Sequence, residues 1–247
     1  MTQKFFNKNY LKEIIFRIDF HPVHILSGEY ANPNVFEEYI LDEFPELVKF
    51  PYEPTQVVIN DGENSNVQNL DSIWVYQKED YKKIQISNSY VILSYNGEYY
   101  DNKKPFLEDV ERIIQALIKI GVEKSTFIGL RYINEITPVN PIKNWENWIN
   151  PDLINFKFNI PESNMIRSLS KTEYKIKDYS FSFQYGQFNL NYPSSVIRDD
   201  FILDYDCFTS NVEEISELRN IYLEMNEIIY NFFIKSIGDE LEKNMEG

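Results

Sequence analysis

Cysteine and glycine are scarce in this 247-residue chain, which has one Cys and 8 Gly. The single cysteine, Cys207, excludes an internal disulfide and is typical of a reducing compartment. Neither GxxxxGK(S/T) nor GxGxxG occurs, so the common phosphate-binding loops are excluded. No stretch approaches the ~20 apolar residues that a membrane helix needs, and the N-terminal residues contain no continuous apolar segment. We therefore expect a cytoplasmic protein with no membrane span and no cofactor.

Basic side chains are the minority among the charged ones, with 24 Lys and Arg against 39 Asp and Glu and a formal net charge of −15. Such a field repels phosphate backbones, and the basic residues form only short pairs such as Lys103/Lys104, so nucleic-acid binding is not expected. An acidic surface is compatible with plain solubility, with a basic partner protein, or with imitation of a polynucleotide. The composition leaves these alternatives, and a homo-oligomer, open.

Aromatic residues are abundant by contrast, at 16% with 18 Tyr and 18 Phe, and the hydrophobic fraction of 43% is that of a globular protein. Residue patterns predict strands at 11–20, 55–60, 72–80, 82–88, 89–97, 126–136, 173–186, 187–195 and 199–208. Helical spacing of apolar residues predicts helices at 33–44, 106–120 and 213–235, the second capped by Gly121. We expect an α+β fold in which a curved, mainly antiparallel sheet is covered on one face by two long helices, 106–120 and 213–235.

The length of the chain allows one large domain. We interpret residues 1–247 as a single globular domain, or as two intimately packed lobes, 1–137 and 172–247, joined by the irregular segment 138–171 with its Pro and Trp residues. Both lobes run through strands into a helix, but no sequence motif aligns between them.

Four short motifs follow one another in a characteristic order. They are Glu13-Ile14-Ile15-Phe16, Arg131-Tyr132-x-Asn134-x-Ile136, a strand with Asp204 and Asp206, and Phe233-x-x-x-Ile237-x-x-Glu240-Leu241-x-x-x-Met245. In this order and spacing the chain resembles a sporadically distributed, uncharacterised family of prokaryotic proteins of similar length. The resemblance covers nearly the whole chain and implies no specific activity. The patchy distribution of the family implies mobile or defence-associated gene neighbourhoods, and hence a role beside a toxin or an antiviral effector.

Arg131 lies in GLRYINEI, residues 129–136, which otherwise has the composition of a buried strand. Alternate residues of a strand share a face, so Arg131 points away from Leu130 and Tyr132, which are expected in the core together with Asn134. A buried guanidinium persists chiefly when a carboxylate satisfies it in bidentate geometry. The candidate carboxylates are Glu13, Asp19, Asp204 and Asp206. We predict a structural polar network of Glu13, Arg131, Asn134 and Asp204; the alternative is an anion-binding arginine in a cleft.

Asp204 and Asp206 lie on one face of a strand, ~7 Å apart, a spacing that a divalent metal could bridge. With Glu13 or Asp19 as a third carboxylate and Arg131 stabilising a phosphate, they would form the site of a metal-dependent nuclease or phosphohydrolase. Two acids on one strand face are more commonly a solvated surface. This site therefore remains the alternative hypothesis.

The remaining reactive side chains indicate no catalytic centre. His21 and His24 have no further ligand to complete a zinc set. Cys207 is expected in the core, and the adjacent carboxylate would raise the pKa of its thiol. Ser194 and Ser195 lack the glycines of a nucleophile elbow.

Trp145 and Trp148 lie in the irregular segment NWENWINP. Tryptophans in such segments either contact partners or plug the edge of a core, and we take these two as candidate partner-binding residues. Because no complete catalytic set is present, we expect a cytosolic, non-catalytic interaction protein that binds a partner protein through an acidic or aromatic surface. Antiviral defence and toxin neutralisation are its expected settings.

Overall fold

The structure is a computed structural model that describes residues 6–27, 31–49, 73–100, 103–137, 145–154, 167–189, 192–193 and 200–247. In these ranges the strands are β1 (Leu11–Phe20), β2 (Glu46–Lys49), β3 (Trp74–Lys78), β4 (Lys82–Ile86), β5 (Tyr90–Asn96), β6 (Lys124–Ile136), β7 (Ser168–Ile176), β8 (Tyr179–Phe188), β9 (Asp200–Thr209) and β10 (Glu213–Glu214). The α-helices are α1 (Asn34–Ile40), α2 (Lys103–Lys119), α3 (Leu218–Ser236) and α4 (Asp239–Glu246). Short 3₁₀ helices are η1 (His24–Leu26), η2 (Gly97–Tyr99), η3 (Trp145–Asn147), η4 (Pro151–Leu153) and η5 (Ile215–Glu217).

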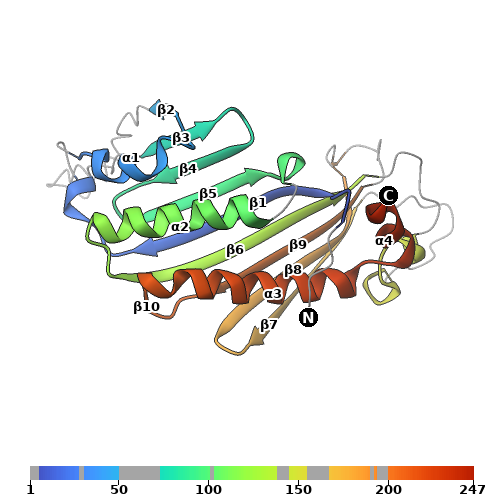
Figure 1. Ribbon diagram of the computed structural model, residues 1–247. Helices are drawn as coiled ribbons and strands as arrows, with labels where there is room; N and C mark the ends of the chain where they lie inside the picture. Colours follow the sequence, from blue (N-terminus) through green and yellow to red (C-terminus); the bar gives the residue numbers. More distant parts are fainter. Residues whose placement is uncertain are drawn as a thin grey trace, which may run out of the picture.

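The described strands form one open sheet. Its order is β2-β3-β4-β5-β1-β6-β9-β8-β7, with β10 pairing on β6, and each pairing is antiparallel. Helices α2 and α3 lie on the same face of the curved sheet (Figure 1). The predicted α+β class and the curved, mainly antiparallel sheet are confirmed.

Strand alternation explains where the core lies. In β1 the residues Ile14, Phe16, Ile18 and Phe20 are buried, whereas the residues between them are partly or fully exposed. The buried set faces the helices, since the ring of Phe16 packs edge-on against Tyr222 of α3. Helix α2 presents its own apolar stripe to this layer, with Phe106, Val110, Ile113 and Leu117 buried. The burial of apolar surface on this one face, which contributes about 25 cal/mol per Å², is the main stabilising contribution to the fold.

Most predicted elements lie where the pattern placed them, with informative differences. Gly121 has φ +90°, as expected of a helix cap. The segment 173–186, predicted as one strand, is a hairpin that turns at Lys177, a non-glycine residue with φ 53°. The helix predicted at 213–235 begins instead with β10 and η5, because Glu213 pairs with Ser125 of β6. The strand predicted at 55–60 lies outside the described residues, and so do residues 190–191 and 194–195 of the strand predicted at 187–195.

The two halves of the sheet have the same topology around the seam where β1 pairs with β6. From the seam outward, one half runs β1, β5, β4, β3 and the other runs β6, β9, β8, β7, with β2 as an additional edge strand of the first half; the helix α2 or α3 follows the strands of each half. In the strand register Phe16 pairs with Leu93, and Leu130 pairs with Cys207. The number of residues between the two partners is the same in both pairs. Along the chain, α2 is the last element of the first of these halves and β6 is the first element of the second.

Candidate functional site: the open face of the sheet

The sheet has a second face, opposite α2 and α3, which we call the open face. Its residues follow from the strand registers and from the alternation with buried positions. Across its centre they are Lys83 and Gln85 on β4; Tyr90, Ile92, Ser94 and Asn96 on β5; Glu13, Ile15, Arg17 and Asp19 on β1; Phe127, Gly129, Arg131 and Ile133 on β6; and Asp204, Asp206 and Phe208 on β9.

Arg131 and Asp204 form a bidentate ion pair on the open face. The Arg131 Nε donates to Asp204 Oδ1 at 2.8 Å, and Nη2 donates to Oδ2 at 2.7 Å. The hydrogen bonds to Asp204 raise the pKa of Arg131, and Asp206 and Glu13 add smaller favourable interactions. The expectation of a buried guanidinium is wrong: the Arg131 side chain is 44% exposed, while that of Asp204 is 8% exposed. The buried partner is therefore the carboxylate, and the arginine covers it.

Asp206 lies directly opposite Arg131 in the strand register but makes no hydrogen bond with the described residues. Burial raises its pKa, the neighbouring guanidinium of Arg131 opposes that rise, and Asp204 adds to it. Glu13 lies on β1, which pairs with the other side of β6. It also forms no ion pair within the described ranges. The centre of the open face thus contains one satisfied carboxylate and two that lack a direct cationic partner.

Asn134 does not belong to this cluster, although the sequence suggested one network. Its side chain is buried on the helix side of β6, and its Nδ2 donates to the backbone oxygen of Leu203 at 3.3 Å. A strand sends residues of opposite parity to opposite faces. Asn134 and Arg131 are thus separated by the thickness of the sheet.

Arg17 occupies in the first half the position that Arg131 occupies in the second. Its Nε donates to Asp19 Oδ1 at 2.7 Å and its Nη2 to Oδ2 at 3.1 Å, and the guanidinium lies 5.1 Å from the centre of the Tyr90 ring. From the sequence, Asp19 was a candidate partner of Arg131 and a candidate third metal ligand, but its pairing with Arg17 was not predicted. The signal was present, because Arg17 and Asp19 are two residues apart in a strand and share a face.

An aromatic pair adjoins these charges. The rings of Phe127 and Phe208 are stacked with centroids 5.8 Å apart. Gly129 makes room for them, since a Cβ added there would lie 3.0 Å from the ring of Phe127. A glycine inside a strand commonly marks such a close approach. The open face therefore combines fixed charges with an exposed edge of aromatic surface.

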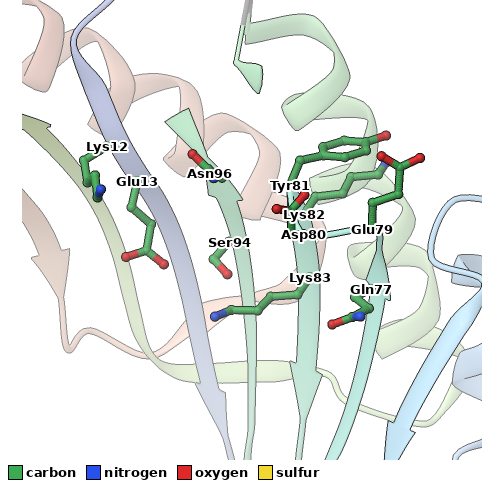
Figure 2. Close-up of a pocket in the computed structure, with 10 residues that line it drawn as sticks. All are labelled: Lys12, Glu13, Gln77, Glu79, Asp80, Tyr81, Lys82, Lys83, Ser94 and Asn96. Carbon is green, nitrogen blue, oxygen red and sulfur yellow. The ribbon is translucent and has the colours of Figure 1, made fainter. Parts of the chain in front are cut away.

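A shallow hollow of about 230 Å³ lies at one side of the open face, where the β3–β4 turn meets β5 and β1. Lys83 extends across β5 toward the strand that carries Glu13, with Ser94 between them (Figure 2). Neither Lys83 nor Glu13 has an ion pair within the part of the chain that the structure describes. The hollow therefore offers a positive and a negative group to a bound side chain.

Behind this hollow, on the helix side of the sheet, lies a buried ionic cluster that the sequence analysis missed. Lys82 Nζ donates to Asp109 Oδ2 at 2.7 Å and to Glu43 Oε2 at 2.9 Å, and the Tyr95 hydroxyl donates to the same Asp109 oxygen. The sequence could have predicted the burial of Lys82, because Lys82 is two residues from the buried Ile84 in β4 and its side chain therefore lies on the same face. The cluster joins α1, α2 and the sheet.

The candidate metal site is not assembled. Both oxygens of Asp204 bind Arg131, and no group of three His, Cys, Asp or Glu side chains that could hold a metal ion occurs among the described residues. His21 and His24 are exposed in the segment after β1. Burial, and then the charge of Asp206, raises the pKa of the Cys207 thiol to about 12, which disfavours a nucleophile. Ser194 and Ser195 lie outside the described residues.

Trp145 and Trp148 do not form an exposed aromatic patch. Trp145 is only 2% exposed and packs against Phe201, with ring centroids 5.2 Å apart. Trp148 is half-buried against the core. The 3₁₀ helix η3 places Trp145 over the end of β9, so its assignment as a partner-binding residue is corrected to a core position.

No known family model matches this chain, and no curated protein matches it. None of the helices in the described ranges has both the length and the apolar character needed to cross a membrane.

Proposed function

We propose that this chain is a cytosolic, non-catalytic binding protein that holds a basic segment of a partner protein against its open face. One observation carries the proposal: the open face surrounds Asp206, a half-buried carboxylate without a hydrogen-bond partner in the described part of the chain, with charges and rings that are already fixed in place. Such preorganisation reduces the entropy lost on binding.

The carboxylates at the centre of the open face favour a basic side chain of the partner protein. Glu13 and Asp206 flank Arg131 and lack direct cationic partners, so a lysine or arginine of the partner would gain charge-assisted hydrogen bonds there. The stacked rings of Phe127 and Phe208 offer apolar surface beside them. The formal net charge of −15 would steer a basic partner toward the protein. A basic toxin or effector is the kind of partner this proposal describes.

The metal-dependent nuclease or phosphohydrolase is not favoured, because Asp204 has both oxygens occupied by Arg131. A metal ion would have to displace a bidentate guanidinium to use this carboxylate. The open face supports recognition better than hydrolysis.

The test compares a change on each face of the sheet. Asp206→Lys reverses the charge at the centre of the open face, and Asp206→Asn removes it with little change in shape. Glu227→Lys makes the same reversal on the exposed surface of α3 and serves as the matched control. Circular dichroism checks that each variant is folded.

Affinity capture from the native host, followed by calorimetry with the purified partner, measures the effect. We expect wild type and Glu227→Lys to bind alike, Asp206→Asn to bind about tenfold more weakly, and Asp206→Lys to lose binding. Capture of a protein whose affinity is unaffected by both Asp206 variants contradicts the proposal. So does equal weakening by Glu227→Lys.

A further inference from the structure

Strand β7 ends the sheet with a long uncovered edge. It has nine residues, and no strand in the described ranges pairs with its outer side. The hairpin of β7 and β8 extends beyond α3 (Figure 1). Lys171, Glu173, Tyr174 and Lys175 are exposed, and 44% of Tyr174 is accessible.

An edge of this length is a template for another strand, because its outer N–H and C=O groups are not used within the sheet. Lysines on an edge deter most foreign strands. Here Glu173 lies between Lys171 and Lys175, so the edge carries alternating charges on the open-face side. An antiparallel strand complements it when it places an acid opposite Lys171 and a base opposite Glu173, and a second copy of β7 does so in the register that sets Lys171 of one copy opposite Glu173 of the other.

We propose that β7 pairs antiparallel with β7 of a second copy of this chain, about a two-fold axis at Thr172. Thr172 is the midpoint of Ser168–Ile176, so only this register pairs all nine residues. It places Lys171 opposite Glu173 of the partner subunit, and symmetry repeats the contact. The dimer joins two sheets into one.

Other registers are disfavoured by charge or by length. An axis at Glu173 places this carboxylate opposite its own copy and Lys171 opposite Lys175 of the partner subunit, and like charges directly opposite are destabilising. An axis at Tyr174 pairs only the residues from Thr172 to Ile176. The register centred on Thr172 is the one that satisfies both conditions.

The ion pair within β7 does not prevent this exchange. Lys171 Nζ lies 2.8 Å from Glu173 Oε1 of the same strand, with both side chains more than half exposed. Exposed pairs of this kind contribute little to stability. In the dimer each side chain gains a directly opposite partner, and Tyr174, which contacts Phe232 of α3, faces Ser170 of the partner subunit.

Charge exchange tests the register directly. Lys171→Glu places two acids opposite two acids, and Glu173→Lys places two bases opposite two bases. Each variant alone should therefore dimerise at least about tenfold more weakly than wild type. An equimolar mixture of the two has opposite charges at every contact and should form a heterodimer. The double variant Lys171→Glu/Glu173→Lys should dimerise like wild type, and Lys119→Glu on α2 is the control.

Sedimentation equilibrium over a range of concentrations gives the mass. Wild type is expected to move from 29.5 kDa to twice that value as concentration rises, and the mixture should do the same. A wild-type chain that stays monomeric throughout overturns the proposal. Single variants that dimerise like wild type, or a mixture that stays monomeric, overturn the register. Lys171 interacts electrostatically with Asp206 and Asp204 of the open face, so the mass is measured on the chain alone, without the partner protein.

Discussion

Replacing Lys82 with methionine removes the buried cation that contacts both Asp109 and Glu43 beneath the helices. The Lys82 side chain is 5% exposed and that of Asp109 is 3% exposed. Asp109 would keep the Tyr95 hydroxyl and a longer contact with Arg112, whose Nε lies 3.7 Å from Oδ1, but would lose its closest counter-charge. Breaking a buried pair by removing one partner costs about 3–5 kcal/mol. A domain of this kind is stable by only about 5–15 kcal/mol. Lys82→Met should therefore remove about a fifth or more of the free energy of unfolding.

The double variant Lys82→Met/Asp109→Leu separates the charge from the packing. With both charges gone, no buried charge is left uncompensated and only the neutral Tyr95 hydroxyl loses its acceptor, so stability should return to within about 1–3 kcal/mol of wild type. Lys83→Met is the matched control, because Lys83 is the exposed neighbour on the same strand and its loss should change stability by less than about 0.5 kcal/mol.

Urea unfolding followed by circular dichroism measures all three variants, with the midpoint and the slope fitted together. A cost below about 1 kcal/mol for Lys82→Met would refute the reasoning. The same holds if the double variant is as unstable as the single one, because the penalty would then come from lost packing and not from an unpaired carboxylate.

Three further predictions concern the open face and the core. Arg131→Ala leaves the buried Asp204 carboxylate unpaired and should cost about 1–3 kcal/mol in urea unfolding; an unchanged midpoint contradicts this. Burial raises the pKa of Asp206 above its ordinary value of 3.8, so the folded state keeps this proton to higher pH than the unfolded chain does. The contribution of Asp206 to the free energy of unfolding therefore falls as the pH rises past 3.8. Asp206→Asn removes that loss and should be more stable than wild type at neutral pH, with the difference vanishing below pH 3.8; a pH-independent difference argues against it. The Cys207 thiol, buried and with its pKa raised to about 12, should react with a thiol reagent only when the protein unfolds, and rapid labelling of the native chain contradicts this.

The sequence predicted the elements whose pattern is local. The alternation of Ile14, Phe16 and Ile18 defines β1, and Gly121 marks the end of α2 because a positive φ favours glycine. The turn at Lys177 was missed, since nothing in a lysine signals the left-handed conformation that this hairpin requires. Its residues therefore read as the middle of one long strand.

The candidate site was predicted in part. The alternation of side chains along the strand placed Arg131 on the other face of the sheet from Leu130. The charge of Arg131 required a carboxylate partner, and Asp204 was among the candidates. Which face of the sheet the helices cover depends on packing between distant segments, so the exposure of Arg131 could not be read from its own strand. Trp145 failed for a similar reason: its composition fits a partner contact, but Phe201, far along the chain, buries it.

The seam between β1 and β6 has a consequence for synthesis on the ribosome. β1 pairs with β5 on one side and with β6 on the other, and β6 is translated only after α2. A nascent chain that ends after α2 contains the strands of the first half but leaves the β6 side of β1 as an unpaired edge. Such edges recruit other chains, so we expect truncation after residue 121 to give aggregates, and a translational pause at that point to require a chaperone.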